Sequence, residues 1–234
     1  ATAVSNDRAA TAYHQQQQRQ QQHGIKLLSQ MFPLHIARII ERGGNPEPES
    51  HELVTIYFSD IVGFTSLAAA LSDLKVSSML NRLYHAFDDL AQKHDLFKIE
   101  TIGDAYMCAS NLAKKQPEDH VRRIAKFAAD AAKAAGRIPV DEDDLSKGYI
   151  RIRGGFHTGP VVSNVVGTLN PRYGVFGDTV NVAARMESTS AAGRIQCSER
   201  SALLLMTQDP RIQVRLRGEV QIKGKGSMVT YWTN

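Results

Sequence analysis

The order of apolar patterns along the first two thirds of the chain restricts its fold more than any single motif does. Leu53–Ser59 (LVTIYFS) is rich in β-branched and aromatic residues, which is typical of a buried strand. Apolar residues then recur at i, i+3, i+4 and i+7 from Val76 to Ala91, so a long amphipathic helix should follow. The stretch FKIETIGDAYM, from Phe97 to Met107, predicts a strand, a tight turn and a second strand.

A second helix and further strands complete the pattern. We expect this helix to start at Pro117 and to stop at Gly136, and two strands joined by a turn at Thr158–Pro160 should come after it. The order β-α-β-β-α-β predicts an α+β fold, with a ferredoxin-like core whose helices lie on one face of an antiparallel or mixed sheet. Additional strands and helices are expected beyond this core.

Composition divides the 234 residues into three predicted parts. Residues 1–24 contain the run QQQQRQQQ, a low-complexity Gln-rich segment that is too polar to bury a core of its own. Residues 25–49 carry apolar side chains at helical spacing, which predicts a helical linker with an amphipathic face that packs on the domain. Together with the Gln-rich segment, this linker suggests a sensor or membrane module upstream. Residues 50–234 form the predicted globular domain. No apolar run approaches the roughly 18 residues of a membrane span, so we expect no membrane span in this chain. We expect the domain to be cytoplasmic, in a full-length protein that an upstream module could attach to a membrane.

The charge and the cysteines exclude two classes of function. A net charge of +4 is compatible with a small anionic ligand such as a nucleotide. It does not amount to the strong basic stripe of a dedicated nucleic-acid binder, so we expect no nucleic-acid partner. Cys108 and Cys197 are far apart and lack the spacing of a zinc site, so we interpret both as free, buried thiols.

Two aspartates stand where strands are predicted to end. Asp60 closes the first strand and precedes the turn Ile61–Thr65, where a carboxylate could hold Mg²⁺ and backbone N–H groups could cradle phosphates. Asp104 follows Gly103 in the hairpin turn, and if the two strands are neighbours the pair could form a two-metal site. Each has a plainer alternative, because Asp60 could simply cap a helix and Gly-Asp is a common turn dipeptide.

Four segments together resemble one enzyme family. FSDIVGFTSL, KIETIGDAYM, RYGVFGDTVNVAARMES and KGKG follow in that order within roughly residues 50–233. They are similar to the signature segments of class III nucleotidyl cyclases, most of all the receptor-type guanylyl cyclases. The stretch LLSQMFPLHIARIIERG also resembles the helical linker that precedes the catalytic domain in those receptors.

The resemblance implies a two-metal reaction in which the 3′-hydroxyl of a nucleoside triphosphate attacks its own α-phosphorus and pyrophosphate leaves. By this resemblance, Asp60 and Asp104, with the Ile61 carbonyl, hold two Mg²⁺ or Mn²⁺ ions per active site. One ion lowers the pKa of the attacking hydroxyl, and the other binds the polyphosphate. Asn181 would orient the ribose, and Arg185 would stabilise the charge that develops at the α-phosphate.

The same resemblance assigns the rest of the substrate site. Lys223, in KGKG, matches the lysine that contacts the terminal phosphates, and Gly63, Phe64 and Thr65 belong to the phosphate-binding turn. In this family the metal aspartates come from one domain, and the base-reading and transition-state residues come from the other. A chain that carries both halves is therefore expected to act as a head-to-tail homodimer with two sites at the interface.

Base selection points to GTP. Glu100 occupies the purine-reading position, where its carboxylate would accept hydrogen bonds from N1–H and N2–H₂ of guanine but would face the acceptor N1 of adenine unpaired. The second purine position holds Gly174, where guanylyl cyclases commonly have Cys and adenylyl cyclases Asp. Glycine offers no side-chain donor to guanine O6, but it also removes the usual acceptor for the amino group of adenine.

Three interpretations remain open on the sequence alone. The chain is a guanylyl cyclase that forms cyclic GMP, or an adenylyl or mixed-specificity cyclase that uses ATP, or a non-catalytic dimerisation or nucleotide-sensing module. A polymerase or diguanylate cyclase would also use two acids, but it would not explain the Asn181–Arg185 pair or the KGKG segment.

Overall fold

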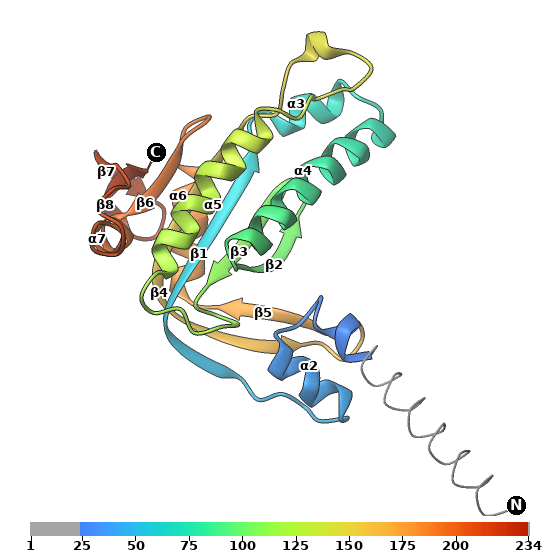
Figure 1. Ribbon diagram of the computed structural model, residues 1–234. Helices are drawn as coiled ribbons and strands as arrows, with labels where there is room; N and C mark the ends of the chain where they lie inside the picture. The colour runs from blue at the N-terminus through green and yellow to red at the C-terminus, as the bar shows by residue number, and fades with distance from the viewer. Residues whose placement is uncertain (1–23, 234) are drawn as a thin grey trace, which may run out of the picture. The chain divides into compact units, whose positions relative to one another are not determined.

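The computed structural model describes residues 24–233, so the predicted Gln-rich segment lies outside them apart from Gly24 (Figure 1). Backbone proximity divides the described residues into two compact units. The larger comprises Ser50–Val162 and residues 175–233, and the smaller comprises residues 24–49 and Ser163–Gly174. The boundaries of the three parts expected from composition stay a prediction.

The first elements of the larger unit confirm the predicted β-α-β-β-α-β order. They are β1 (Glu49–Ile61), α3 (Phe64–Ala69), α4 (Asp73–Lys93), β2 (Phe97–Ile102), β3 (Ala105–Ser110), α5 (His120–Ala135), a short 3₁₀ helix (Leu145–Lys147) and β4 (Ile152–Val166). The additional elements follow. They are β5 (Arg172–Phe176), α6 (Asp178–Ser188), β6 (Ile195–Ser198), α7 (Glu199–Gln208), β7 (Val214–Ile222) and β8 (Gly226–Thr233).

The strands form one mixed sheet in the order β2-β3-β1-β4-β6-β8-β7, with β5 paired to β4. The first four positions are the arrangement of a ferredoxin-like core. Strands β1 and β3 run antiparallel, and their register pairs Ser59 with Tyr106. Because antiparallel partners advance in opposite directions, the next residues of β1 meet the turn that precedes β3. The register therefore brings Asp60 and Ile61 up to Asp104.

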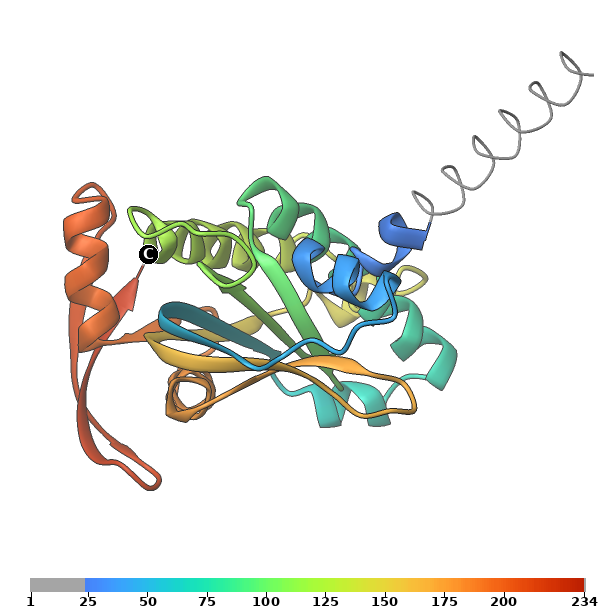
Figure 2. The same ribbon diagram turned by 90° about the horizontal axis from the view of Figure 1, so that it is seen from below.

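Helices α4 and α5 lie side by side over one face of this sheet (Figures 1 and 2). The layer between them and the strands is filled by the fully buried rings of Tyr57, Phe87, Tyr106 and Phe127. Tyr57 meets Phe127 edge-to-face at 5.4 Å between ring centroids, and Phe87 meets Tyr106 in the same way at 5.3 Å. Such pairs contribute about 0.5–1.5 kcal/mol each beyond their burial, so they fix the hairpin and α4 to the same core.

The core helices α4 and α5 share one face as predicted, whereas the additional helix α6 covers the opposite face of the sheet (Figure 2). Gly154 and Gly155 explain the difference, because consecutive strand residues point to opposite faces. A Cβ on Gly154 would meet the Tyr57 ring, whereas a Cβ on Gly155 would lie 2.1 Å from the backbone nitrogen of Glu187 in α6. Because both glycines lack a side chain, the aromatic core can pack against one face of β4 and the backbone of α6 against the other face.

Two local predictions from the sequence are wrong. The predicted turn at Thr158–Pro160 does not exist, because β4 continues straight through it. The Thr158 hydroxyl lies in a buried hydrogen-bond chain with Thr55 and Ser201, which holds this segment extended. Helix α5 begins at His120 rather than at Pro117, since the Asp119 carboxylate turns to bind the arginines of the first helical turn.

The smaller unit contains α2 (Leu34–Glu41), within the predicted helical linker. Phe32, Ile36 and Ala37 are buried, and the His35 ring nitrogen Nε2 lies 3.0 Å from the Glu49 carboxylate. Across residues 24–233, every helix is too short or too polar to cross a membrane.

Substituting Gly155 with alanine tests the packing of α6. We expect Gly155→Ala to lower the free energy of unfolding by about 1–3 kcal/mol in urea denaturation, because the new methyl group would collide with the backbone of α6. Gly136→Ala is the matched control, since a Cβ there stays 3.6 Å from its nearest neighbour and the backbone is helical. Equal stability of the two variants would contradict the close approach of α6.

Candidate active site

The structure brings the two predicted metal aspartates together on one backbone group. The N–H of Ile61 lies 3.1 Å from Oδ1 of Asp60 and 3.2 Å from Oδ2 of Asp104. Asp104 reaches this point because the hairpin reverses in two residues, with Gly103 at the first of them in the left-handed region (φ +62°). A two-residue turn of this kind needs glycine in that position. The carboxylates of Asp60 and Asp104, from two separate segments of the chain, thus converge at one end of β1.

Burial and the neighbouring Asp60 make the Asp104 carboxyl harder to deprotonate. Partial burial, a hydrogen bond to Asp60 and the negative charge of Asp60 together raise the pKa of Asp104 to about 7. The N–H groups of Ile61 and of Asp104 itself lower this pKa, but they do not offset the raising effects. A pair of carboxylates held this way favours a bound positive charge.

An arginine on β4 supplies part of that charge. Nη2 of Arg153 donates to Oδ2 of Asp60, while its Nε donates to Oε1 of Glu187 on α6 over 2.6 Å. Burial raises the pKa of Glu187, the charge of Arg153 lowers it, and the charge of Asp60 raises it. Sequence reasoning missed both residues, although an arginine between the buried Ile152 and Gly154 was a signal that a charge had a partner inside the fold.

The donor set fits a hard divalent cation. Both aspartates offer only oxygen, and the carbonyl of Ile61 follows Asp60 directly in the chain. Mg²⁺ and similar ions bind proteins through one or two carboxylates and take further ligands from substrate phosphates and water. Within residues 24–233 no group of three or more His, Cys, Asp or Glu side chains could hold a metal, so the pair at Asp60 and Asp104 is the place to test.

Glu100 stands on the same hairpin but on an outer strand. Strand β2 is at the edge of the sheet, and its pairing with β3 shifts by a bulge between Lys98 and Glu100. A bulge re-aims the side chains that follow it. Glu100 is exposed, and no hydrogen bond or ion pair engages it in the described part of the chain. Its carboxylate is available to a ligand.

The predicted transition-state pair lies on α6. Asn181 is exposed and Arg185, one turn later, is half-buried, so both can face one ligand. Lys223 is exposed in the turn between β7 and β8. In the same turn, Nζ of Lys225 binds Oδ2 of Asp178 at 2.5 Å, which ties the turn to the first residue of α6. These three predicted residues thus share one region around α6.

In the described part of the chain, the predicted residues around α6 do not contact the two aspartates directly. Within residues 24–233, no hydrogen bond or ion pair connects Asn181, Arg185 or Lys223 to Asp60 or Asp104. The contact from α6 to Asp60 runs instead through Glu187 and Arg153, described above. The structure therefore places the predicted site residues in two groups.

The remaining predicted residues fall into a turn and a strand. Gly63 (φ +74°) precedes α3, and its carbonyl accepts from Ser66 and Leu67, which starts the helix. Phe64 packs on the core, whereas Thr65 is exposed. Gly174 lies in β5 and belongs to the smaller unit.

Comparison with known proteins decides the family. The sequence profile described as "Adenylate and Guanylate cyclase catalytic domain" matches residues 47–234. This chain belongs to that family. The resemblance inferred from four sequence segments is thereby confirmed, and so is the α+β fold with its ferredoxin-like core.

Individual relatives agree with this membership. Retinal guanylyl cyclase 2 of Mus musculus is 45% identical over 207 residues, which cover 88% of this chain and 18% of that protein. The chain thus spans about a fifth of the length of such relatives. The guanylate cyclase domain of RhGC from Catenaria anguillulae, solved in complex with GTP, is 35% identical with a TM-score of 0.73, covering 80% of this chain and 98% of that one. A guanylyl cyclase domain of the RhoGC fusion protein from Blastocladiella emersonii, solved as a non-canonical dimer, is 34% identical with a TM-score of 0.70, covering 79% of this chain and 97% of that one.

The raised pKa of Asp104 predicts how stability depends on pH when divalent ions are chelated. A carboxyl with a higher pKa in the folded state than in the unfolded chain stabilises the fold at low pH, and this stabilisation is lost as pH rises from about 4 to about 7. We expect Asp104→Asn to raise the free energy of unfolding relative to wild type by roughly 1 kcal/mol at pH 8, after allowance for solvent screening, and by little at pH 4.

Urea denaturation in EDTA across this pH range checks the expectation. Glu100→Gln removes an exposed charge from the same hairpin and serves as the control. Added Mn²⁺ should stabilise the wild type more than Asp104→Asn. A stability difference that does not change between pH 4 and pH 8 would contradict the electrostatic coupling of the two aspartates.

Proposed function

We propose that this domain is a guanylyl cyclase that converts GTP into cyclic GMP and pyrophosphate. The observation that carries the proposal is the convergence of Asp60 and Asp104 on the Ile61 N–H, in a chain whose profile is that of a cyclase catalytic domain. The guanylyl cyclase names of the similar proteins, and the GTP complex of one of them, support GTP over ATP.

Asp60, Asp104 and the Ile61 carbonyl would hold two divalent ions per site, Mg²⁺ or Mn²⁺. When bound, such ions lower the pKa of the 3′-hydroxyl and offset the charge of the triphosphate. The chain's own contribution is to fix the two carboxylates at one end of β1, where Ile61 and Arg153 hold them ready. Bringing charged ligands together in advance removes the cost of reorganising them during the reaction.

The reaction itself needs positioning more than covalent chemistry. The 3′-oxygen forms a bond to the α-phosphorus, the bond from that phosphorus to the bridging oxygen breaks, and pyrophosphate departs. Asn181 would orient the ribose and Arg185 would bind the α-phosphate oxygens as negative charge develops there. Lys223 would bind the terminal phosphates, together with the backbone of Gly63, Phe64 and Thr65.

Base recognition would rest on Glu100. Its exposed carboxylate, beyond the bulge in β2, can accept two hydrogen bonds from guanine. Gly174 adds no side chain to this contact, so O6 of guanine would be bound by a backbone N–H, a water or a nearby side chain. A single carboxylate then carries most of the discrimination against adenine, whose N1 leaves it unpaired.

We further propose that the active form is a head-to-tail homodimer. The separation of the predicted residues into an aspartate group and an α6 group supports this arrangement, since each group would complete the other across a two-fold axis. In the full-length protein we place this domain in the cytoplasm, downstream of a sensor or membrane module.

Reversing the charge at Glu100 tests base selection. We expect Glu100→Lys to lower the rate of cyclic GMP formation at least tenfold and to raise cyclic AMP formation from ATP, because the donor edge of guanine would face a cation. Product analysis with each nucleotide and Mn²⁺ measures both. Glu118→Lys reverses the charge of another exposed glutamate and should leave both rates nearly unchanged. Unaltered GTP turnover in Glu100→Lys would exclude the base-reading role.

Mixing two inactive variants tests the shared site. Asp104→Ala and Asn181→Ala chains should each be inactive, and their equimolar mixture should recover about a quarter of wild-type activity, since half of random dimers would hold one intact site of two. A mixture of Asp60→Ala with Asp104→Ala damages the same group twice and should recover nothing. If the first mixture is as inactive as the second, the sites are not shared between chains.

A further inference from the structure

The turn of the hairpin that carries Glu100 and Asp104 lies at the edge of the sheet. Strand β2 is at the edge of the sheet, and Ile102, just before the turn, is 59% exposed. A two-residue turn leaves its central peptide group outside the strand ladder, so the carbonyl of Gly103 needs a donor from elsewhere. Glycine in the turn also leaves the backbone more freedom than any other residue would.

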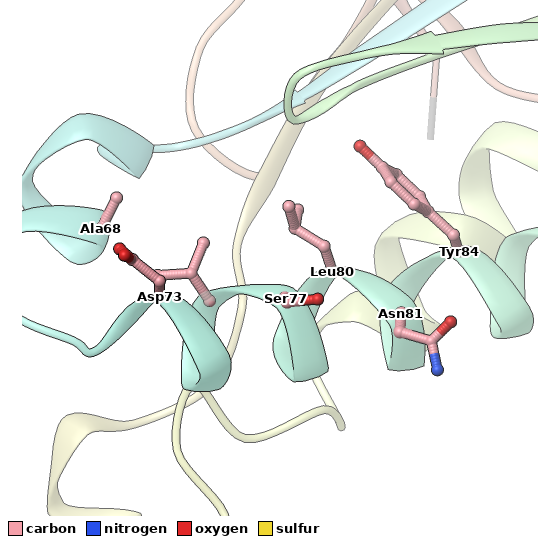
Figure 3. A pocket seen from close by; sticks show the side chains of 7 residues that line it. Ala68, Asp73, Ser77, Leu80, Asn81 and Tyr84 are labelled. Carbon is pink, nitrogen blue, oxygen red and sulfur yellow. The ribbon is translucent and has the colours of Figure 1, made fainter.

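Tyr84 on α4 provides that donor. Its hydroxyl Oη donates to the Gly103 carbonyl over 2.7 Å. Figure 3 shows the Tyr84 side chain at one end of a groove along α4, beyond Leu80 and Asn81, with its hydroxyl directed toward the turn. The carbonyl of Gly103 and the N–H of Asp104 belong to one planar peptide group. Fixing the carbonyl therefore fixes the plane from which the Cα of Asp104 emerges.

The Tyr84 ring is itself held by a second set of contacts one turn further along α4. Asp88 accepts from Nζ of Lys98 on β2 over 2.7 Å and from Oη of Tyr106 on β3 over 2.9 Å. Nζ of Lys98 lies over the Tyr84 ring, 5.9 Å from its centroid, and the rings of Tyr84 and Tyr106 are 6.0 Å apart. Helix α4 thus contacts β2, β3 and the turn between them.

The Tyr84 hydroxyl stays protonated beside Asp60 and Asp104. Burial, followed by the negative charges of Asp104 and Asp60, raises the pKa of Tyr84 to about 12. At neutral pH the hydroxyl is therefore a neutral donor. Because that donor is engaged by the turn, Tyr84 has no proton to offer to a substrate, and its effect must pass through Asp104.

We infer that Tyr84 is a positioning residue for the metal site, whose hydrogen bond to the Gly103 carbonyl sets the Asp104 carboxylate at the spacing from Asp60 that a divalent ion requires. This inference rests on the proposed function of the two aspartates. Removing one such hydrogen bond weakens an interaction by roughly two- to tenfold. The loss should appear in metal affinity, since the substrate contacts assigned to Glu100 and α6 are untouched.

The test replaces Tyr84 with phenylalanine, which keeps the ring and removes only the hydroxyl. Binding of Mn²⁺ is measured by the electron paramagnetic resonance signal of the free ion, with 3′-deoxy-GTP present so that no turnover occurs. We expect the Kd for Mn²⁺ to rise about three- to tenfold and the half-saturating Mn²⁺ concentration for cyclisation to rise in parallel. At saturating Mn²⁺, kcat should stay within about twofold of wild type.

Two further variants separate positioning from general stability. Tyr149→Phe alters a tyrosine that is 53% exposed and should change neither Kd nor Tm. para-Aminophenylalanine at position 84 retains an N–H donor and should restore Mn²⁺ binding, even if the phenylalanine variant proves less stable. Unchanged Mn²⁺ affinity in Tyr84→Phe, or failure of the amino variant to restore a lost affinity, would overturn the inference.

These experiments distinguish failure of the positioning role of Tyr84 from failure of the proposed function. A wild-type chain that forms cyclic GMP, beside a Tyr84→Phe chain with the same metal dependence, contradicts only the positioning role. A wild-type chain that forms no cyclic nucleotide, yet binds Mn²⁺ more tightly than Tyr84→Phe, contradicts only the cyclase activity.

Discussion

The repulsion between Asp60 and Asp104 is the interaction on which the rest of this structure depends. Two carboxylates share the N–H of Ile61, and burial, with the hydrogen bond to Asp60 and the negative charge of Asp60, raises the pKa of Asp104 to about 7. A fold tolerates such a pair only when surrounding groups hold it in place. Here the β1–β3 register sets the position of one acid beside the other, and Arg153 compensates part of the charge.

The same constraint explains why elements distant in sequence meet at this point. Arg153 reaches Asp60 from β4 and also binds Glu187, so α6 must lie close against that strand. The bare backbone of Gly155 permits the approach. On the other face, α4 contacts the hairpin through Tyr84 and Asp88. The metal site proposed for the aspartates would thus be supported from both faces of one sheet, while the residues proposed to act on ribose and α-phosphate project from α6.

Much of this arrangement follows from sequence, and the parts that do not have physical reasons. The pairing of Asp60 with Asp104 follows from two acids at strand ends in a β-α-β-β-α-β order. The Arg153–Asp60 contact joins residues 93 apart, and it depends on how α6 packs over Gly155, which no local pattern encodes. The bulge before Glu100 is a register shift between β2 and β3, and the alternation of side chains along FKIETI does not mark it. The extended course of β4 through Pro160 depends on a buried hydroxyl chain formed only in the folded state.

A crystal structure of this chain with 3′-deoxy-GTP and Mn²⁺ would test the central claim most directly. Anomalous scattering locates manganese without reference to any assumed ligand. The account predicts manganese between Asp60 and Asp104 of one chain, with Arg185 of a second chain at the α-phosphate and Glu100 of that second chain at the guanine. Manganese bound away from the two aspartates, or a nucleotide bound by Asp104 and Arg185 of the same chain, would contradict it.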